Sequence, residues 1–203
     1  APAIALPAPT SPGAVSLSAE LGRPAVLTGS QEPAYLRLQV AAAGGDAGER
    51  SPVSMAVALD RSGSMSGDKL DQAKAAVDHL IDLLGPADRL ALVIYDDAAQ
   101  LLYPSSPLTP EHRAAMHRAV AGVETAGSTN LSDGLELVAR QARQAAASTG
   151  AVSRVLLVSD GLANRGLTDP TALAALARRL RQQSLTISTI GVGVDFDHRL
   201  MSD

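Results

Sequence analysis

The sequence lacks cysteine and tryptophan and contains a single phenylalanine among its 203 residues. Disulfide bonds and thiolate zinc sites are therefore excluded. Aromatic residues make up only 2% of the chain and hydrophobic residues 46%, so leucine, valine, isoleucine and alanine must build the core. A chain of this length suits one ordinary domain, with room for a small appendage, and can bury a sizeable core.

An excess of positive charge and a long apolar run are also missing. Seventeen basic residues stand against 21 acidic ones, which gives a net charge of −4. This balance argues against nonspecific nucleic-acid binding, because such binding needs a basic face. Every apolar run is far shorter than the roughly 18 residues that a transmembrane helix needs, so we expect no membrane span in this chain.

The first 50 residues differ in composition from the rest. Residues 1–14 hold four prolines and several alanines, which is typical of an extended tail or linker. Residues 15–21 and 35–41 favour half-buried strands, so we interpret residues 15–50 as a β-strand extension. The chain begins at Ala1 without methionine, which indicates a processed or trimmed product. The proline-rich start favours an extracytoplasmic or cell-envelope location over the cytoplasm.

From residue 51 onwards, short apolar runs alternate with amphipathic helical patterns. Strands are predicted at residues 53–59, 90–95, 155–159 and 185–192, with a short antiparallel edge strand at 101–103. Apolar residues at steps of three and four predict helices at residues 69–84, 132–147 and 171–182. This alternation predicts a doubly wound α/β domain over residues 51–203, with a mostly parallel sheet flanked by helices. We expect the domain to be truncated before its last helix and strand.

Polar clusters follow the apolar runs at three places. Asp60, Ser62 and Ser64 follow the first run, Thr129 precedes a predicted helix, and Asp160 follows the third run. Ligands of open α/β sheets bind beyond the carboxyl ends of the strands, where these clusters should meet. Two carboxylates and three hydroxyls suit a hard divalent cation, and no cysteine or clustered histidine set supports zinc or copper. The sequence therefore predicts a magnesium site, with manganese and calcium left open.

Three segments carry a family resemblance: DRSGSMSG, GSTNLSDGL and LLVSDG resemble the metal-binding loops of the von Willebrand factor type A family. That family has a metal-ion-dependent adhesion site of the pattern Asp-x-Ser-x-Ser, then Thr, then Asp. Asp60, Ser62, Ser64, Thr129 and Asp160 match every position. The resemblance runs from about residue 53 to the end of the chain. It is strongest to bacterial proteins related to inter-α-trypsin inhibitor heavy chains and calcium-activated chloride channel regulators.

The resemblance implies a role for each matching residue. Ser62 and Ser64 would bind the metal directly, while Thr129, Asp60 and Asp160 would bind it directly or through water. A Glu or Asp of a partner protein would complete the coordination shell. We therefore predict a protein-binding module with no catalytic residues.

Two other functions compete with this reading. A subunit that docks onto an intracellular ATPase of the chelatase type would carry the same three loops. A metal-dependent hydrolase is disfavoured, because Ser62 and Ser64 have no nearby histidine base in the sequence and no general base is positioned. Taken singly, Thr129 also fits a helix-start hydroxyl and Asp160 a turn residue.

Several other polar residues are assigned structural roles. Asp133 is typical of the first turn of a helix. Asp195 and Asp197 follow the last predicted strand, and we interpret them as loop or cap residues because no strand-end lysine completes a phosphoryl-transfer site. The histidines lack the spacing of metal ligands, so we expect surface or helix-packing roles for all four: His79, His112, His117 and His198.

Overall fold

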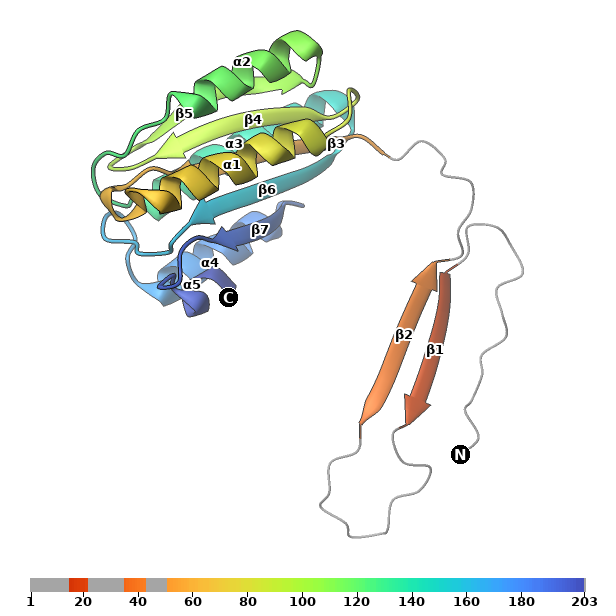
Figure 1. Cartoon of the computed structure of the whole chain (residues 1–203). Coiled ribbons are helices and arrows are strands. Elements are labelled where there is room, and N and C mark those ends of the chain that lie inside the picture. The colour runs from red at the N-terminus through yellow and green to blue at the C-terminus, as the bar shows by residue number, and fades with distance from the viewer. Residues whose placement is uncertain (1–14, 22–34, 43–50, 203) are drawn as a thin grey trace. The chain divides into compact units, whose positions relative to one another are not determined.

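The computed structural model describes residues 15–21, 35–42 and 51–202 (Figure 1). The chain divides into two compact units, Ala1–Arg50 and Ser51–Asp203, each of which is described by itself. The predicted tail over residues 1–14 lies outside the described residues. Within the described residues, no helix is both long and apolar enough to cross a membrane.

The first unit contains one antiparallel strand pair, β1 (Val15–Leu21) and β2 (Leu36–Ala42). Leu17 is paired with Val40 and Ala19 with Leu38. Because directly opposed residues of antiparallel strands point to the same side, these apolar side chains share one face. The predicted N-terminal β-strand extension is thereby confirmed.

The second unit is built on a five-stranded sheet with the strand order β5-β4-β3-β6-β7. The strands are β3 (Val53–Asp60), β4 (Arg89–Tyr95), β5 (Ala99–Pro107), β6 (Val152–Ser159) and β7 (Thr186–Gly191). All neighbouring strands are parallel except β5, which pairs antiparallel with β4 at one edge. The predicted doubly wound, mostly parallel α/β fold is confirmed, and the edge strand is longer than predicted.

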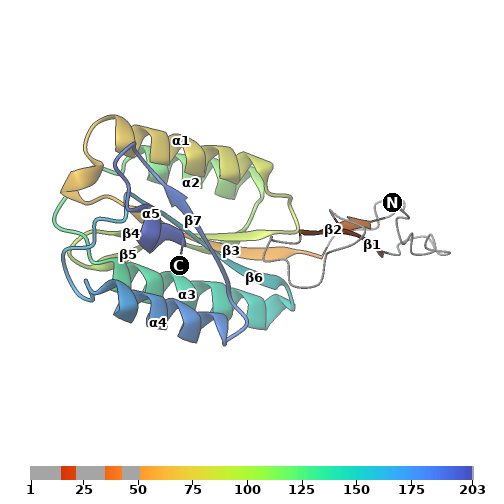
Figure 2. The same cartoon turned by 90° about the horizontal axis from the view of Figure 1, so that it is seen from below.

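Helices cover both faces of this sheet (Figure 2). Helices α1 (Asp68–Leu83) and α2 (Pro110–Ala121) lie on one face, and α3 (Leu131–Thr149) and α4 (Pro170–Arg181) on the other. Central strand β3 is buried between them: Ala56 and Ala58 join the cluster beneath α3 and α4, whereas Val57 and Leu59 join that beneath α1 and α2. Successive side chains of a strand point to opposite faces, which explains the continuous apolar run.

Helix α2 was not among the helices predicted from the sequence. Its start resembles that of α4. Thr109 accepts a hydrogen bond from the His112 N–H just before Pro110, as Asp169 does from the Ala172 N–H before the first proline of α4. Both starts combine an N-cap oxygen with proline in the first turn, which suits a helix beginning.

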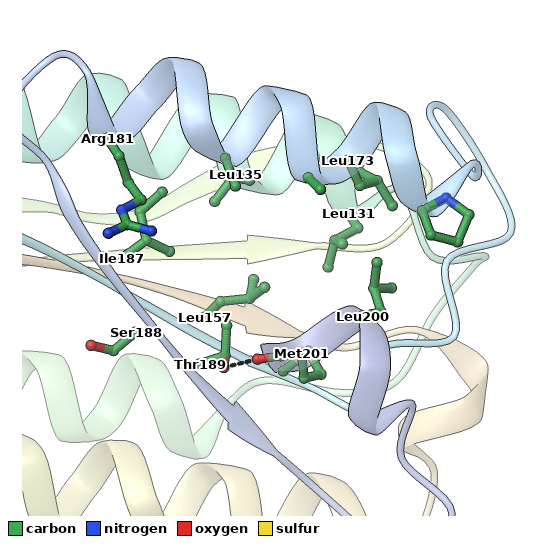
Figure 3. A pocket seen from close by; sticks show the side chains of 13 residues that line it. Leu131, Leu135, Leu157, Leu173, Arg181, Ile187, Ser188, Thr189, Leu200 and Met201 are labelled. Carbon is green, nitrogen blue, oxygen red and sulfur yellow. Dashed lines mark hydrogen bonds between the residues drawn. The ribbon is translucent and has the colours of Figure 1, made fainter. Parts of the chain in front are cut away.

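An apolar cavity of about 210 Å³ lies beside β7, between α3, α4 and the short helix α5 (His198–Ser202) (Figure 3). Leu135, Leu173 and Leu200 contribute to its wall, and at its rim the Thr189 hydroxyl donates to the Met201 carbonyl. None of the five predicted metal ligands lines this cavity. The predicted site must therefore be sought elsewhere, at the strand ends.

Helices α1 and α2 hold each other's C-terminal ends. Lys74 of α1 donates to the carbonyl of Ala121, with 2.8 Å between Nζ and the oxygen. Arg113 of α2 donates in return to the carbonyls of Ile81 and Leu84. These contacts satisfy backbone oxygens that helix ends leave without an intrahelical partner.

His117 of α2 adds a pH-dependent contact, since its Nδ1 lies 2.7 Å from Asp78 Oδ1 and its Nε2 3.1 Å from Asp82 Oδ1. The hydrogen bond with Asp78 raises the pKa of His117 above its ordinary value, although burial opposes the rise. A folded-state pKa above the unfolded one stabilises the fold at pH below the unfolded pKa, and this stabilisation is lost as pH rises through the folded pKa.

We expect His117→Gln to reduce the free energy of unfolding near pH 5.5 by at most about 1 kcal/mol, because the three groups are partly exposed. Near pH 9 the substitution should have almost no effect, since the imidazole is then neutral in both states. Urea denaturation at the two pH values measures the difference. An equal loss at both would show that packing, rather than charge, is what His117 contributes.

Candidate metal centre

Two carboxylates lie at the ends of adjacent parallel strands. Asp60 is the last residue of β3, and Asp160 directly follows β6, whose Val158 is in register with Leu59 of β3. Neither aspartate side chain has any solvent exposure. Two buried groups of like charge at one rim of the sheet are costly unless positive charge or hydrogen-bond donors compensate them.

Three donors hold the Asp60 carboxylate. Its Oδ1 accepts the N–H of Ser62 at 2.9 Å, and its Oδ2 accepts the hydroxyl of Ser159 at 2.6 Å and that of Tyr95 at 3.3 Å. Burial raises the pKa of Asp60 above its ordinary value; the hydrogen bonds from Ser159 and Ser62 lower it, and the charge of Asp160 raises it further. The group is oriented by these donors, but none of these three donors among the described residues carries a positive charge.

The two serine hydroxyls of the first loop lie side by side. Ser62 is buried, Ser64 is half-buried in the short 3-10 helix η1 (Gly63–Met65), and their Oγ atoms are 3.1 Å apart. Main-chain bonds join this loop to the one that contains Thr129. The Gly63 N–H donates to the Gly127 carbonyl at 3.1 Å, and the Ala126 N–H donates to the Arg61 carbonyl at 2.8 Å.

Thr129 links that second loop to the third. Its N–H donates to Asn164 Oδ1 at 2.8 Å, and its carbonyl accepts the N–H groups of Asn164 and Arg165, each at 3.2 Å. Asn130, not Thr129, caps helix α3 by accepting the Asp133 N–H. The Thr129 hydroxyl is buried and has no hydrogen-bond partner within the described residues. The helix-start role considered for Thr129 is therefore wrong.

Two carboxylates and three hydroxyls are oxygen donors of the kind that a hard divalent cation prefers. The described residues contain no group of three or more His, Cys, Asp or Glu placed to hold a metal, so an ion here would depend on hydroxyl ligands. A buried hydroxyl without a partner costs free energy, and buried carboxylates of like charge do too. A cation among oxygen ligands would relieve both costs.

Two residues that support Asp60 were missed as site residues. Ser159 donates to Asp60 and accepts the Gly161 N–H at 2.9 Å. Tyr95 is fully buried, and burial, followed by the charge of Asp60, raises its pKa well above the ordinary value, so it remains a donor. A Cβ on Gly134 of α3 would lie 2.7 Å from the Tyr95 ring, so glycine is what allows this close packing. Tyr95 of β4 is in register with Asp60 of β3. Its contact with Asp60 can therefore be inferred only once the pairing of these two strands is known.

The acidic residues interpreted as structural do have structural contacts. Asp133 accepts the Ala99 N–H at 2.7 Å, which fastens α3 to the start of β5. Asp197 accepts the Leu200 N–H at 3.0 Å in the first turn of α5. Asp133 thus lies in the first turn of its helix, and Asp197 caps α5, which are the roles expected for them.

Lys69 was not anticipated at the site. Its Nζ lies 3.1 Å from Asp160 Oδ2 and 2.8 Å from Asp195 Oδ1. Lys69 belongs to the first turn of α1 and not to a strand end, which is why a search of the strand ends does not reveal it. Asp160 therefore has one cationic neighbour, while its Oδ1 accepts the Leu162 N–H at 3.2 Å in the manner of a turn residue.

Solved structures share this fold. A von Willebrand factor type A protein from Catenulispora acidiphila is 22% identical, with a TM-score of 0.68 over 95% of this chain and 44% of that chain. Proximal thread matrix protein 1 from the mussel byssus, with a zinc-occupied MIDAS motif, is 22% identical. Its TM-score is 0.58, and the match covers 74% of this chain and 38% of that chain. Manganese-loaded TRAP protein of Plasmodium vivax is 18% identical. Its TM-score is 0.60, and the match covers 74% of this chain and 61% of that chain.

Sequence relatives agree with this likeness. YfbK of Escherichia coli (strain K12) is 34% identical over 71% of this chain and 25% of its own length. Human inter-alpha-trypsin inhibitor heavy chain H4 is 26% identical over 74% of this chain and 17% of its own length. The chain thus spans a quarter or less of these two relatives. The model of the von Willebrand factor type A domain matches residues 55–202. This chain belongs to the von Willebrand factor type A domain family.

Proposed function

We propose that this chain is a divalent-cation-dependent protein-binding module. In this proposal Asp60, Ser62, Ser64, Thr129 and Asp160 hold the ion, and a carboxylate of a partner protein completes its coordination. The observation that carries the proposal is the buried hydroxyl of Thr129, which has no hydrogen-bond partner in the part of the chain that the structure describes. It lies in a loop that main-chain hydrogen bonds tie to the loop of Ser62 and Ser64 and to the loop that follows Asp160.

The proposed ligands also explain why an acidic partner can approach. Asp60 and Asp160 together contribute two negative charges, which balance but do not exceed the charge of a divalent ion. The hydroxyls of Ser62, Ser64 and Thr129 add ligand oxygens without adding charge. A bound cation with an open coordination position would therefore supply attraction for an incoming Glu or Asp side chain.

The ligand chemistry limits which ions the site would bind. Oxygen-only ligation favours magnesium, with manganese and calcium as alternatives, over softer metals that prefer nitrogen and sulfur. The zinc of the mussel protein and the manganese of the TRAP protein support a divalent ion in this fold without selecting one. We propose no catalytic role: the Ser62 hydroxyl lies 3.1 Å from that of Ser64 and also interacts with Asp60, which is itself a proposed ligand of the ion.

Thr129→Val tests the ligand set with little structural side effect. Replacing an unpartnered buried hydroxyl by a methyl group of similar shape should leave the melting temperature of the metal-free protein unchanged or raise it. Affinity for magnesium and manganese should fall by at least about tenfold, because a ligand is lost. Isothermal titration calorimetry and thermal unfolding in EDTA measure the two effects. Asp60→Ala is less specific, since it would leave three buried donors without their acceptor.

Ser54→Ala is the matched control. Ser54 is also fully buried, and its hydroxyl has no partner among the described residues, but it lies near the start of β3, at the opposite end from Asp60. Its removal should leave metal affinity as in the wild type. If Thr129→Val and Ser54→Ala bind metal equally well, Thr129 is not a ligand.

Partner binding should depend on the same ion. Proteins from the source organism retained on the immobilised chain in magnesium should be released by EDTA and should not be retained by Thr129→Val. Within a retained partner, changing the contacting Glu or Asp to its amide should abolish retention, because a neutral amide is a much weaker ligand for a hard cation. Retention that persists in EDTA and with Thr129→Val would rule out the metal-mediated mechanism.

A further inference from the structure

A lysine and an acidic loop residue form a charged bridge beside the proposed metal site. Lys69, in the first turn of α1, contacts the fully buried Asp160 at 3.1 Å and the largely exposed Asp195 at 2.8 Å. The hydrogen bond with Asp195 raises the pKa of Lys69, although burial opposes the rise, so its ammonium group is charged at neutral pH. One positive charge is therefore shared between a proposed metal ligand and a surface carboxylate.

The backbone around Asp195 is shaped to receive this lysine. Gly193 has a φ of +88°, and a Cβ there would lie 2.6 Å from Lys69 Cε and 2.9 Å from Asp195 Oδ1. A Cβ at position 193 would therefore push aside the ends of these two side chains, and the positive φ would be strained for a residue that carries one. The same segment is fastened to the site by the Asp197 N–H, which donates to the Asp160 carbonyl at 2.9 Å.

A permanent cation next to a proposed cation site has two opposing effects. In the metal-free protein Lys69 compensates the buried charge of Asp160, which would otherwise be strongly destabilising. A divalent ion bound to Asp160 would be repelled by the same ammonium, which lies 3.1 Å from that carboxylate. Asp195 would weaken that repulsion, because its carboxylate pairs with the same ammonium at 2.8 Å.

We propose that Lys69 is a built-in counter-cation of Asp160 that competes with the divalent ion, and that Asp195 sets the strength of this competition. The inference rests on the proposed metal site and adds to it two residues that tune its affinity. Lys69 and Asp195 act through Asp160 and are positioning residues rather than ligands. Their electrostatic effects on metal binding have opposite signs, which a purely structural role does not predict.

Lys69→Met removes the charge and keeps a similar apolar stem. We expect magnesium and manganese to bind roughly tenfold more tightly, because repulsion by the ammonium is gone. In EDTA the melting temperature should fall, because Asp160 loses its counter-charge. Lys69→Arg should restore both quantities towards wild type. Lys74→Met is the matched control, since Lys74 lies on the same helix but donates to the carbonyls of Ala121 and Val123.

Asp195→Asn should act in the opposite direction. Asp195 is largely exposed, so the variant should fold normally. Metal affinity should fall by about threefold or more, because Lys69 is no longer neutralised from the loop side. In the background of Lys69→Met this effect should disappear, which a double-mutant cycle measured by calorimetry tests directly.

The outcomes separate this inference from the proposed function. If the wild type binds no divalent ion, both proposals are overturned. If the wild type binds magnesium or manganese but Lys69→Met weakens or does not change that affinity, the metal site stands and the competition is wrong. The same conclusion holds if Asp195→Asn has an undiminished effect when Lys69 is absent, or if Lys74→Met tightens binding as much as Lys69→Met.

Discussion

Two carboxylates fully buried at the ends of neighbouring parallel strands impose the main constraint on this domain. Transferring ionised groups from water into a protein interior is costly, so the surroundings must supply donors and positive charge. Asp60 receives the hydroxyls of Ser159 and Tyr95, and Asp160 receives Lys69. The close packing of α3 against Tyr95 and the turn at Gly193 help to hold Tyr95 and Lys69 beside these carboxylates. Much of the local architecture at this rim therefore follows from accommodating negative charge.

The sheet was predictable because central strands are buried on both faces and read as continuous apolar runs. β3 and β6 are examples, and their parallel pairing places Asp60 and Asp160 at one rim. The edge strand β5 (Ala99–Pro107) was predicted only at residues 101–103. An edge strand pairs through one side, and most of its side chains are at least partly exposed, so its sequence carries little apolar pattern. Helix α2 escaped for a related reason, since it buries only Met116 and Val120.

The five proposed ligands could be named from the sequence because each follows or precedes a regular element at a fixed rim of the sheet. Lys69 and Ser159 could not, because their contacts join residues 91 and 99 positions apart. No pattern within a segment reports such a pairing. The unpartnered state of the Thr129 hydroxyl is likewise visible only once the neighbours of its loop are known. The sequence supplied the chemistry of the site, and the structure supplied its electrostatic balance.

The three loops are joined to one another largely through their main chains, as at Gly63 with Gly127 and at Thr129 with Asn164 and Arg165. Leu162 shows the consequence: it gives its N–H to Asp160 while its side chain is 40% exposed beside the proposed site. Main-chain bonds do not depend on which side chain a residue carries. Evolution can therefore exchange such rim residues, and with them the partner preference of the proposed binding site, without changing the main-chain bonds that join the loops.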